Sequence, residues 1–307
     1  MAMTELDGAR ILITGPTGQV GLPVALALAE HNDVIGVARF GDARARERLE
    51  GAGVTCITAD LVGGDLSGVP ADVDHVANFA VAKTGDFEKD LAANVESLGM
   101  LMHHCREATS FLHCSSTAVY EAAGHHDFAE GDPLGDNHRP FGFLPTYSIT
   151  KIAAEAMARY GARQWDLPTT IARLSVPYGD NGGWPAFHFE MMLAGQAVPV
   201  HEDAPSEFNP IHEDDIVAQV PRLLEVASVP ATVVNWAGPD PVSIEDWCLY
   251  LGELVGIMPT FAPTTATIES VRVDTTRMHE LIGPAEVRWR EGLRRMVEIR
   301  RPDLFVD

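Results

Sequence analysis

Residues 10–21 of this 307-residue chain read RILITGPTGQVG, and this stretch decides the expected fold. Residues 10–14 are a short apolar run with β-branched side chains, typical of a strand buried on both faces. Gly15, Gly18 and Gly21 follow in a G-x-x-G-x-x-G pattern and lead into helix-forming residues. Glycines so placed permit a tight turn, close approach of backbone N–H groups to a pyrophosphate, and close packing of helix on strand. We therefore predict a strand–turn–helix unit that binds a dinucleotide at the helix N-terminus.

The first half of the chain continues to alternate strand-like and helix-like segments. Such alternation is typical of a parallel sheet whose strands are joined by crossover helices. The predicted class is α/β: a Rossmann-type doubly wound parallel sheet with a smaller C-terminal part that binds substrate. Strands are expected at Arg10–Thr14, Asp33–Ala38, Val54–Thr58, Asp74–Ala80, Ser110–Cys114 and Thr169–Leu174, and helices at Val20–Glu30, Phe87–Ala108 and Tyr147–Trp165.

The pattern changes after Pro177, where turn residues and apolar residues interleave as far as Pro210. We expect residues 1–176 to form the dinucleotide-binding domain and residues 177–307 to be mainly substrate-binding, with 205–230 returning to the Rossmann sheet. Later helices are expected at Phe187–Ala194, Asp215–Ala227, Ser243–Val255, Thr275–Ile282 and Glu291–Arg300.

Composition limits the possible partners. The chain has 22 Lys and Arg residues against 44 Asp and Glu residues, which gives a formal net charge of −22. This excess argues against binding to nucleic acid or to an anionic membrane, because both need a clustered positive surface. The N-terminus has no basic start followed by an apolar run, and no stretch approaches the roughly 18 uninterrupted apolar residues of a membrane helix. We expect a soluble, cytoplasmic protein that acts on a small molecule.

No metal site is expected. The four cysteines are far apart and form no C-x-x-C pair, so we interpret them as reduced, mostly buried thiols. His125, His126 and Asp127 form the one cluster that suggests a metal, but no third ligand follows at a suitable spacing. We interpret this cluster as a solvated loop.

The end of the second expected strand bears on the choice of cofactor. A residue about 20 positions after the glycines meets the adenosine ribose, where an acid binds the 2′-hydroxyl and an arginine accommodates a 2′-phosphate. Residues 37–40 read VARF, so the edge carries Arg39 and no acid. We favour NADP(H), with Arg39 on the 2′-phosphate and NAD(H) as the alternative. An ordinary exposed side chain is the alternative interpretation of Arg39.

Tyr147 and Lys151 are spaced as Y-x-x-x-K at the start of a helical segment. Four residues are about one turn, so both side chains lie on one face. A nearby cation favours the phenolate form of a tyrosine, which can then exchange a proton with a carbonyl or alcohol oxygen. Residues 115–117 place hydroxyls after the fifth strand, where a hydroxyl can hydrogen-bond the reacting oxygen. A chance pair of surface residues is the alternative.

Together these motifs resemble an extended short-chain dehydrogenase/reductase of the NAD-dependent epimerase/dehydratase group. The resemblance runs nearly from end to end. In chain order, the matching stretches are GPTGQVG at 15–21, Asp60-Leu61, Asn94, SSTAVY at 115–120, YSITK at 147–151, Arg173 to Gly179, and HEDD at 212–215.

The resemblance implies a role for each matching residue. Tyr147 would be the acid/base, and Lys151 would hold the nicotinamide ribose. Ser116, four residues before Tyr120, matches the active-site Ser/Thr of the group, and Asn94 matches a position that supports the proton-relay region. Cofactor contacts are implied for Gly15, Thr17, Gly18, Gln19, Val20, Gly21, Asp60, Leu61, Ala80, Val81, Asn94, Lys151 and Ser175, and substrate contacts for Thr117, Phe141, Trp184, Phe208 and Asn209.

The chain departs from this group in three places. Thr117 and Ala118 stand where the 4,6-dehydratases carry an Asp–Glu pair, which disfavours dehydration. Val176 and Phe208 stand where the sugar-nucleotide enzymes usually carry Asn and Arg, and that Arg holds the diphosphate. These departures favour a compact carbonyl compound or alcohol over a nucleotide sugar, with Arg277 left open as a compensating cation.

The predicted function is hydride transfer between NADP(H) and a carbonyl or secondary alcohol. Two alternatives stay open. One is an NAD-dependent sugar epimerase that returns the hydride to the opposite face of its substrate. The other is a non-catalytic module that senses a dinucleotide. The resemblance also implies a homodimer formed through the helices at Phe87–Ala108 and Tyr147–Trp165.

Overall fold

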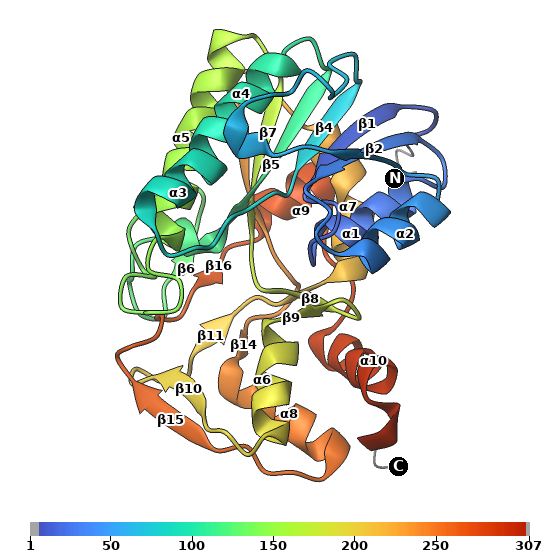
Figure 1. The fold of residues 1–307 in the computed structure, drawn as a ribbon. Helices are drawn as coiled ribbons and strands as arrows, with labels where there is room; N and C mark the ends of the chain where they lie inside the picture. The colour runs from blue at the N-terminus through green and yellow to red at the C-terminus, as the bar shows by residue number, and fades with distance from the viewer. Residues whose placement is uncertain (1–5, 305–307) are drawn as a thin grey trace. The chain divides into compact units, whose positions relative to one another are not determined.

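The computed structural model describes residues 6–304, which form two compact units (Figure 1). The first unit comprises the described part of Met1–Ser116 together with Ile149–Arg173 and Val217–Val234. The second comprises Thr117–Ser148, Leu174–Ile216 and the described part of Asn235–Asp307. The chain therefore leaves the first unit after β5 and returns to it twice.

The expected division at residue 176 lies close to the change of unit after Arg173. Of the expected return over 205–230, residues 205–216 belong to the second unit, and the first unit resumes at Val217–Val234. Residues 117–148, which the sequence placed with the first part, fold with the second unit. This segment is rich in turn residues and has no clear helix or strand periodicity, so the sequence did not indicate in which unit it folds.

The first unit is built on a seven-stranded sheet with the order β13-β7-β5-β4-β1-β2-β3. The pairs from β3 to β5 are parallel, and β1 lies between β2 and β4, so the direction of the crossovers reverses at β1. This doubly wound sheet confirms the predicted fold class. Its strands are β1 (Arg10–Thr14), β2 (Asp33–Ala38), β3 (Thr55–Thr58), β4 (His75–Asn78), β5 (Ser110–Ser116), β7 (Thr169–Leu174) and β13 (Thr232–Trp236).

Helices pack on both faces of this sheet. In Figure 1, α4 (Ser97–His104) and α5 (Tyr147–Gln164) run along one side, and α1 (Gly21–Leu28) and α2 (Ala43–Gly51) lie on the other. Leu101 of α4 and other residues of α4 and α5 join buried residues of the central strands in one apolar cluster. Because both faces are covered, the central strands are continuous apolar runs and do not alternate.

The long helix expected over Phe87–Ala108 is interrupted. It consists of α3 (Phe87–Leu91), a π-helical turn over Ala92–Glu96, and α4. A π-turn inserts an extra residue into a helix and is frequent at functional sites. Here it carries Asn94, whose contacts are described below.

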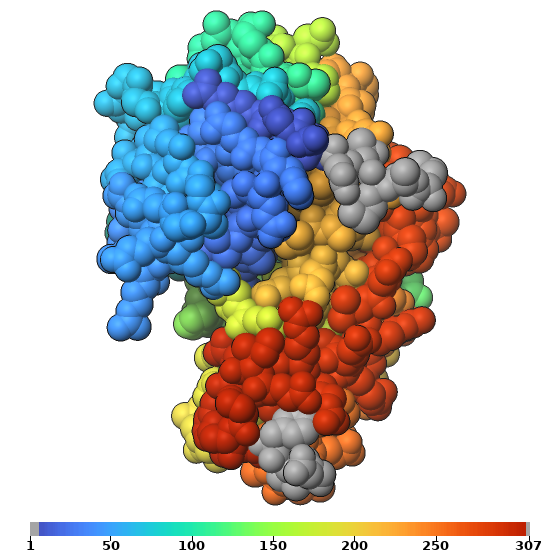
Figure 2. Space-filling view, turned by 90° about the vertical axis from the view of Figure 1, so that its right-hand side faces the viewer, coloured from blue at the N-terminus to red at the C-terminus, as the bar shows by residue number. Residues whose placement is uncertain are grey.

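The second unit consists of short sheets and helices. In Figure 2, α10 (red) covers part of the surface of this unit. Its helices are α6 (Trp184–Leu193), α8 (Ile244–Val255), α9 (Thr276–Ile282) and α10 (Trp289–Arg300), while α7 (Glu213–Glu225) begins here and ends in the first unit. Its strands are β6 (Asp127–Phe128), β8 (Pro177–Gly179), β9 (Gly182–Gly183), β10 (Val198–His201), β11 (Glu207–Phe208), β12 (Ile211–His212), β14 (Val242–Ser243), β15 (Phe261–Thr264) and β16 (Arg272–Val273).

Two elements of the first unit have no counterpart in the sequence prediction. The α2 segment, ARARERLEG, has strongly polar residues and buries only Leu49, so it lacks the apolar periodicity of a helix. The edge strand β13 lies far along the chain from the strand it joins. Within residues 6–304, no helix has the length and apolar character needed to cross a membrane.

Candidate active site

The turn between β1 and α1 is a cradle of closely approaching backbone atoms. Gly15 has φ of +67°, and a Cβ at this residue would lie 2.9 Å from the backbone nitrogen of Ala80. A Cβ at Gly21 would overlap the carbonyl oxygen of Gly15. The Gly18 N–H donates to that same oxygen at 3.0 Å. Glycine is therefore required at both ends of the turn, as the sequence pattern predicts.

The helix that follows, α1, has no side-chain cap from its N-cap residue. Val20 is the N-cap residue of α1 and provides no side-chain hydrogen bond to the first turn. The first N–H groups of a helix have no partner within the helix, and the helix dipole adds partial positive charge there. Thr17 and Gln19 lie in the same turn, directly before these donors. This arrangement suits a phosphate group.

Three paired strands carry a row of buried polar side chains beneath this turn. The Thr14 hydroxyl donates to Asn78 Oδ1 at 2.5 Å, and Asn78 Nδ2 lies 3.1 Å from His113 Nδ1. An amide nitrogen only donates, so His113 Nδ1 accepts and the ring proton is on Nε2. Burial, with a further contribution from the Lys151 ammonium, lowers the pKa of His113 to about 3, so its ring is neutral. The row joins the last residues of β1 and β4 to the middle of β5.

The carboxylates that follow β2 and β3 are both used as helix caps. Arg39 is exposed directly after β2. The nearest carboxylate, Asp42, caps α2, with Oδ1 accepting from the Arg44 N–H at 2.9 Å. After β3, exposed Asp60 caps the short 3₁₀ helix that begins at Leu61. The edge of β2 therefore presents a cation.

The segment after β4 is held by Asn94. Its Oδ1 accepts from the Ala82 N–H at 2.7 Å, and its Nδ2 donates to the Ala82 carbonyl at 2.9 Å. Ala80 is half-buried, and Val81 is 40% exposed. Asn94, buried in the π-turn, thus fixes the backbone that follows these two residues and leaves Val81 accessible.

The predicted proton-transfer residues lie at the end of β5 and the start of α5. Ser116 is the last residue of β5 and is half-buried, and Thr117 follows it, buried, in a 3₁₀ turn. Tyr147 is the first residue of α5 and is half-buried. Lys151 follows one turn later on the same helix. The helical spacing predicted from Y-x-x-x-K is therefore present.

Ser148 and His138 fix the first turn of α5. The Ser148 hydroxyl donates to the Ala118 carbonyl at 2.7 Å and accepts from the His138 N–H at 3.2 Å. The His138 ring lies against the Tyr147 ring, with centroids 5.2 Å apart. The loop after β5 is thereby attached to the residue next to the predicted acid/base.

Lys151 is buried, and its ammonium donates to the Cys114 carbonyl at 2.7 Å. Burial lowers the pKa of Lys151, while the negative charge of Glu155 opposes this change. The cation is therefore held two residues before Ser116 along β5.

Two of the expected substrate residues lie inside the second unit. Phe208 is 2% exposed, and its ring packs against Trp184 with centroids 5.0 Å apart. Asn209 is 4% exposed, and its Oδ1 accepts from the Val273 N–H at 3.0 Å. Trp184 is half-buried. Of these residues, Trp184 presents accessible aromatic surface.

Phe141 and Ser175 also lie in the second unit. Phe141 is half-buried and its ring lies 6.0 Å from that of Phe143. Ser175 is fully buried, and its N–H donates to the Trp236 carbonyl at 2.8 Å. The Ser175 hydroxyl is buried without a hydrogen-bond partner among residues 6–304. The backbone of Ser175 therefore stabilises the fold, whereas its hydroxyl makes no hydrogen bond within the described residues.

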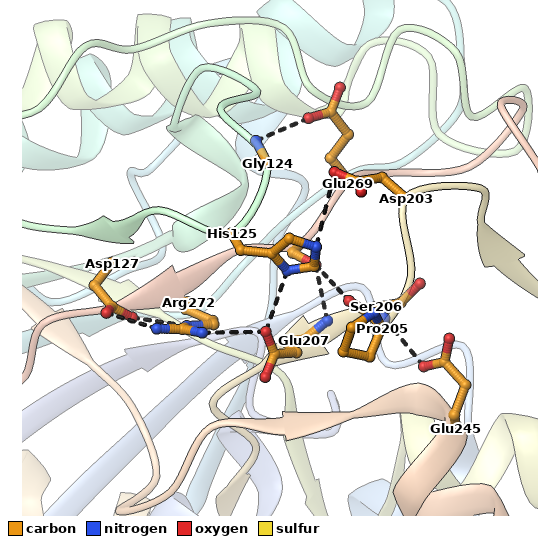
Figure 3. Close-up of polar contacts among 11 residues, drawn as sticks. Gly124, His125, Asp127, Asp203, Pro205, Ser206, Glu207, Glu245, Glu269 and Arg272 are labelled. Atoms are coloured by element: carbon orange, nitrogen blue, oxygen red, sulfur yellow. Dashed lines mark hydrogen bonds and ion pairs between the residues drawn. The ribbon is translucent and has the colours of Figure 1, made fainter.

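The cluster that suggested a metal is occupied by protein ion pairs (Figure 3). His125 Nδ1 lies 3.2 Å from Glu207 Oε2, and its Nε2 lies 3.7 Å from Asp203 Oδ2. Arg272 forms two bonds to Asp127, at 2.6 and 2.7 Å, and also binds Glu207 at 3.1 Å. His125, with a side chain 32% exposed, thus has partners within the chain, whereas the side chains of His126 and Asp127 are 51% and 56% exposed, as expected of a solvated loop.

Several residues of the site gave no signal in the sequence. His113, His138 and Ser148 have partners that are close only in the folded chain. Glu155 and Arg173 form a buried ion pair with 2.9 Å between Arg173 Nη2 and Glu155 Oε2. Glu155 stands one turn after Lys151, so its place on the same helix face could have been predicted from the sequence. The sequence gives no sign that the Glu155 side chain is buried.

Comparisons with known proteins support the interpretation of these motifs. The sequence model of the NAD dependent epimerase/dehydratase family matches residues 11–234. The low-salt glycan biosynthesis protein Agl12 of Haloferax volcanii is 25% identical over 241 residues, which cover 71% of this chain and 74% of that protein.

Two solved structures show the similarity of the fold. The UDP-glucuronic acid 4-epimerase from Bacillus cereus, in complex with UDP-glucuronic acid and NAD, has a TM-score of 0.81 at 20% identity, over 94% of this chain and 98% of that chain. The UDP-N-acetylglucosamine 4-epimerase from Methanobrevibacter ruminantium M1, in complex with UDP-N-acetylmuramic acid, has a TM-score of 0.82 at 18% identity, over 97% and 100%.

Replacement of Gly15 by Ala tests the turn. The new Cβ combines a left-handed backbone with a clash against Ala80, so we expect the free energy of unfolding to fall by about 3 kcal/mol. Gly8→Ala is the control, because Gly8 has φ of +69° with open space around it, and should cost about 1 kcal/mol. Urea denaturation measures both. Equal losses in the two variants would contradict the steric argument.

Proposed function

The chain belongs to the NAD-dependent epimerase/dehydratase family, and from this premise we propose that it transfers a hydride between NADP(H) and the carbonyl or secondary-alcohol carbon of a small molecule. The observation that carries this proposal is the buried Lys151 ammonium, one helical turn after Tyr147 and bonded to the strand that ends at Ser116. A buried cation at this place has a clear use in tuning a phenol.

The residues present fit a dinucleotide. At Gly15 and Gly21 the turn has room for backbone but not for a side chain, and the N-cap residue Val20 makes no side-chain hydrogen bond to α1. A pyrophosphate binds to the N–H donors at such a helix N-terminus. We propose that the turn residues hold the phosphates, Asp60 and Leu61 flank the adenine, and Ala80 and Val81 flank the adjoining ribose. Asn94 would act by fixing the backbone at Ala82.

The reacting groups of the chain have separate tasks. A bound nicotinamide ring supplies the hydride donor or acceptor. The Tyr147 hydroxyl exchanges a proton with the substrate oxygen, and the Ser116 hydroxyl hydrogen-bonds that oxygen. The Lys151 ammonium, one helical turn after Tyr147, holds the nicotinamide ribose. We propose Thr117, Phe141 and Trp184 as substrate contacts, and Ser175 as a cofactor contact through its unused hydroxyl.

We favour NADP(H) because the edge of β2 presents Arg39 and because Asp42 is used as a helix cap. The Bacillus cereus epimerase binds NAD, and this keeps NAD(H) as the alternative. The chemistry is the same for both dinucleotides, and the 2′-phosphate alone separates them.

A nucleotide-sugar epimerase is the second candidate, favoured by the fold similarity to UDP-sugar 4-epimerases. An epimerase shows no net redox change and keeps its dinucleotide through purification. The purified protein should therefore be assayed for NADPH consumption with a panel of small carbonyl compounds and for interconversion of UDP-sugars. Turnover in the first assay supports the main proposal, and turnover in the second alone replaces it.

We also propose a homodimer in the cytoplasm. On the two helices expected at the interface, Leu101 and Met102 of α4 are buried in the core of the first unit, whereas Tyr160 of α5 is 56% exposed. An aromatic side chain exposed on a long helix is a suitable centre for an interface between two copies. Sedimentation velocity measures the mass.

Tyr147→Phe tests the acid/base. The variant keeps the ring but has no proton to exchange, so turnover should fall by about a hundredfold or more while dinucleotide affinity stays within about twofold. Turnover is measured with the substrate found above and affinity by calorimetry. Near-normal turnover would remove Tyr147 from the mechanism.

Arg39→Ala tests the cofactor preference. Loss of a charge-assisted bond to the 2′-phosphate should weaken NADPH binding about tenfold and leave NADH binding nearly unchanged. Arg48→Ala is the matched control, because it also removes an exposed arginine, one that lies on α2 and not at the end of β2. An Arg39→Ala variant that binds NADPH as tightly as the wild type would contradict the assignment.

A further inference from the structure

A buried carboxylate that the proposed mechanism does not use lies next to Lys151. Glu155 is 0% exposed, although Glu is rarely fully buried without a partner. Its Oε1 accepts from the Ser115 hydroxyl at 2.7 Å and from Arg173 Nε at 2.9 Å. Its Oε2 accepts from Arg173 Nη2 at 2.9 Å and from Arg159 Nη1 at 3.1 Å. Four bonds from three residues therefore fix this side chain.

The bonds keep Glu155 ionised. Burial alone would raise the pKa of Glu155, but the hydrogen bonds and charge of Arg173, with Ser115 and Arg159, outweigh burial and lower it. Arg173 is itself 2% exposed. A buried ion pair contributes little net stability compared with apolar residues of the same shape, so stability alone does not account for it.

The position of Glu155 on α5 couples it to the active site. Lys151 and Glu155 are four residues apart and therefore lie on the same helix face. Lys151 binds the carbonyl of Cys114, and Glu155 binds the hydroxyl of Ser115, which is the next residue of β5. Two successive turns of the helix are thus attached to two successive residues of the strand, directly before Ser116.

The titratable groups around Lys151 come from β5, β7, α5 and the segment after β4. From β5, His113 is neutral, and the Cys114 thiol has a pKa raised by burial, so both are uncharged. From β7 there is Arg173, and from α5 there are Tyr147, Glu155 and Arg159. From the segment after β4, the Lys83 ammonium acts electrostatically on Cys114. Glu155 supplies the negative charge in this group, and its field favours the ammonium form of Lys151.

We propose that Glu155 is a positioning residue of this active site: its buried carboxylate fixes α5 against β5 beside Ser116 and keeps Lys151 in the ammonium form. The proposal depends on the proposed function for the roles of Ser116 and Lys151, but the charge state of Lys151 can be measured without any cofactor or substrate.

The composition of the chain makes this measurement direct. It contains three lysines, Lys83, Lys89 and Lys151. Protein labelled with ¹³C at lysine Cε therefore gives three NMR signals, and Lys151→Met assigns the one of interest. Titration from pH 6 to pH 11, with the fold monitored by thermal unfolding, gives the midpoint of each lysine.

Glu155→Gln keeps the size of the side chain and removes its charge. The midpoint of Lys151 should fall by about one pH unit, because the positive form loses its nearby anion. Arg159→Gln is the matched control: it removes another partner of Glu155, one with a side chain 34% exposed, and should shift the midpoint by less than about 0.3 units. A folded Glu155→Gln variant with the wild-type midpoint would overturn the proposal.

Ser115→Ala tests the geometric part and leaves the ion pair intact. We expect kcat to fall about tenfold with an unchanged dinucleotide Kd, and Ser115→Thr to restore it, because the threonine again offers a hydroxyl. Wild-type kcat in Ser115→Ala would overturn the positioning role, including where Glu155→Gln does not fold. A wild-type protein without dinucleotide binding would instead defeat the proposed function, while the Lys151 titration would still decide the charge role.

Discussion

The close approach of backbone atoms at the β1–α1 turn is the constraint on which the first unit depends. Gly21 lies against the carbonyl of Gly15, and Gly15 lies against the backbone of Ala80, so neither position has room for a Cβ. One turn therefore fixes the start of α1 and the distance between β1 and the segment after β4. Hydrogen bonds from Thr14 to Asn78 and from Asn78 to His113 then connect β1 through β4 to β5. The dinucleotide cradle and the strand that carries Ser116 are parts of one packed layer.

Electrostatics at the site is decided locally. The net charge of −22 disfavours a polyanionic partner, but it does not determine the charge state of a buried ammonium. Exposed charges are screened over about 10 Å, whereas groups buried together interact in a lower dielectric. Lys151 therefore responds to its own burial and to the carboxylate of Glu155, not to the acidic exterior. The acidic surface therefore does not replace Glu155, the buried anion that favours the charged form of buried Lys151.

The sequence predicted what depends on local periodicity and spacing. The strand Arg10–Thr14, the glycine turn and the Tyr147–Lys151 pair lie where their patterns indicate. Contacts between residues far apart in the chain were not predictable, because no pattern joins Asn94 to Ala82 or Ser115 to Glu155. The polar α2 helix was missed for the opposite reason: its sequence has too few apolar residues to show a period. The partners of His125 were also not predictable. They are far from it in the chain, and they lie in a loop and a short strand that show no periodicity.

The surroundings of Phe208 bear on the substrate class. Its ring packs with Trp184 and Trp247, and burial lowers the pKa of the adjacent His188 to about 3, so that ring is neutral. The interior of the second unit around Phe208 therefore offers aromatic surface and a neutral imidazole to its neighbours. A diphosphate needs charge-assisted donors, which such an interior does not supply. Binding of a nucleotide sugar would require a cation from elsewhere, and exposed Arg277 is the candidate. A compact carbonyl compound needs no such compensation, and for this reason we propose the reductase ahead of the epimerase.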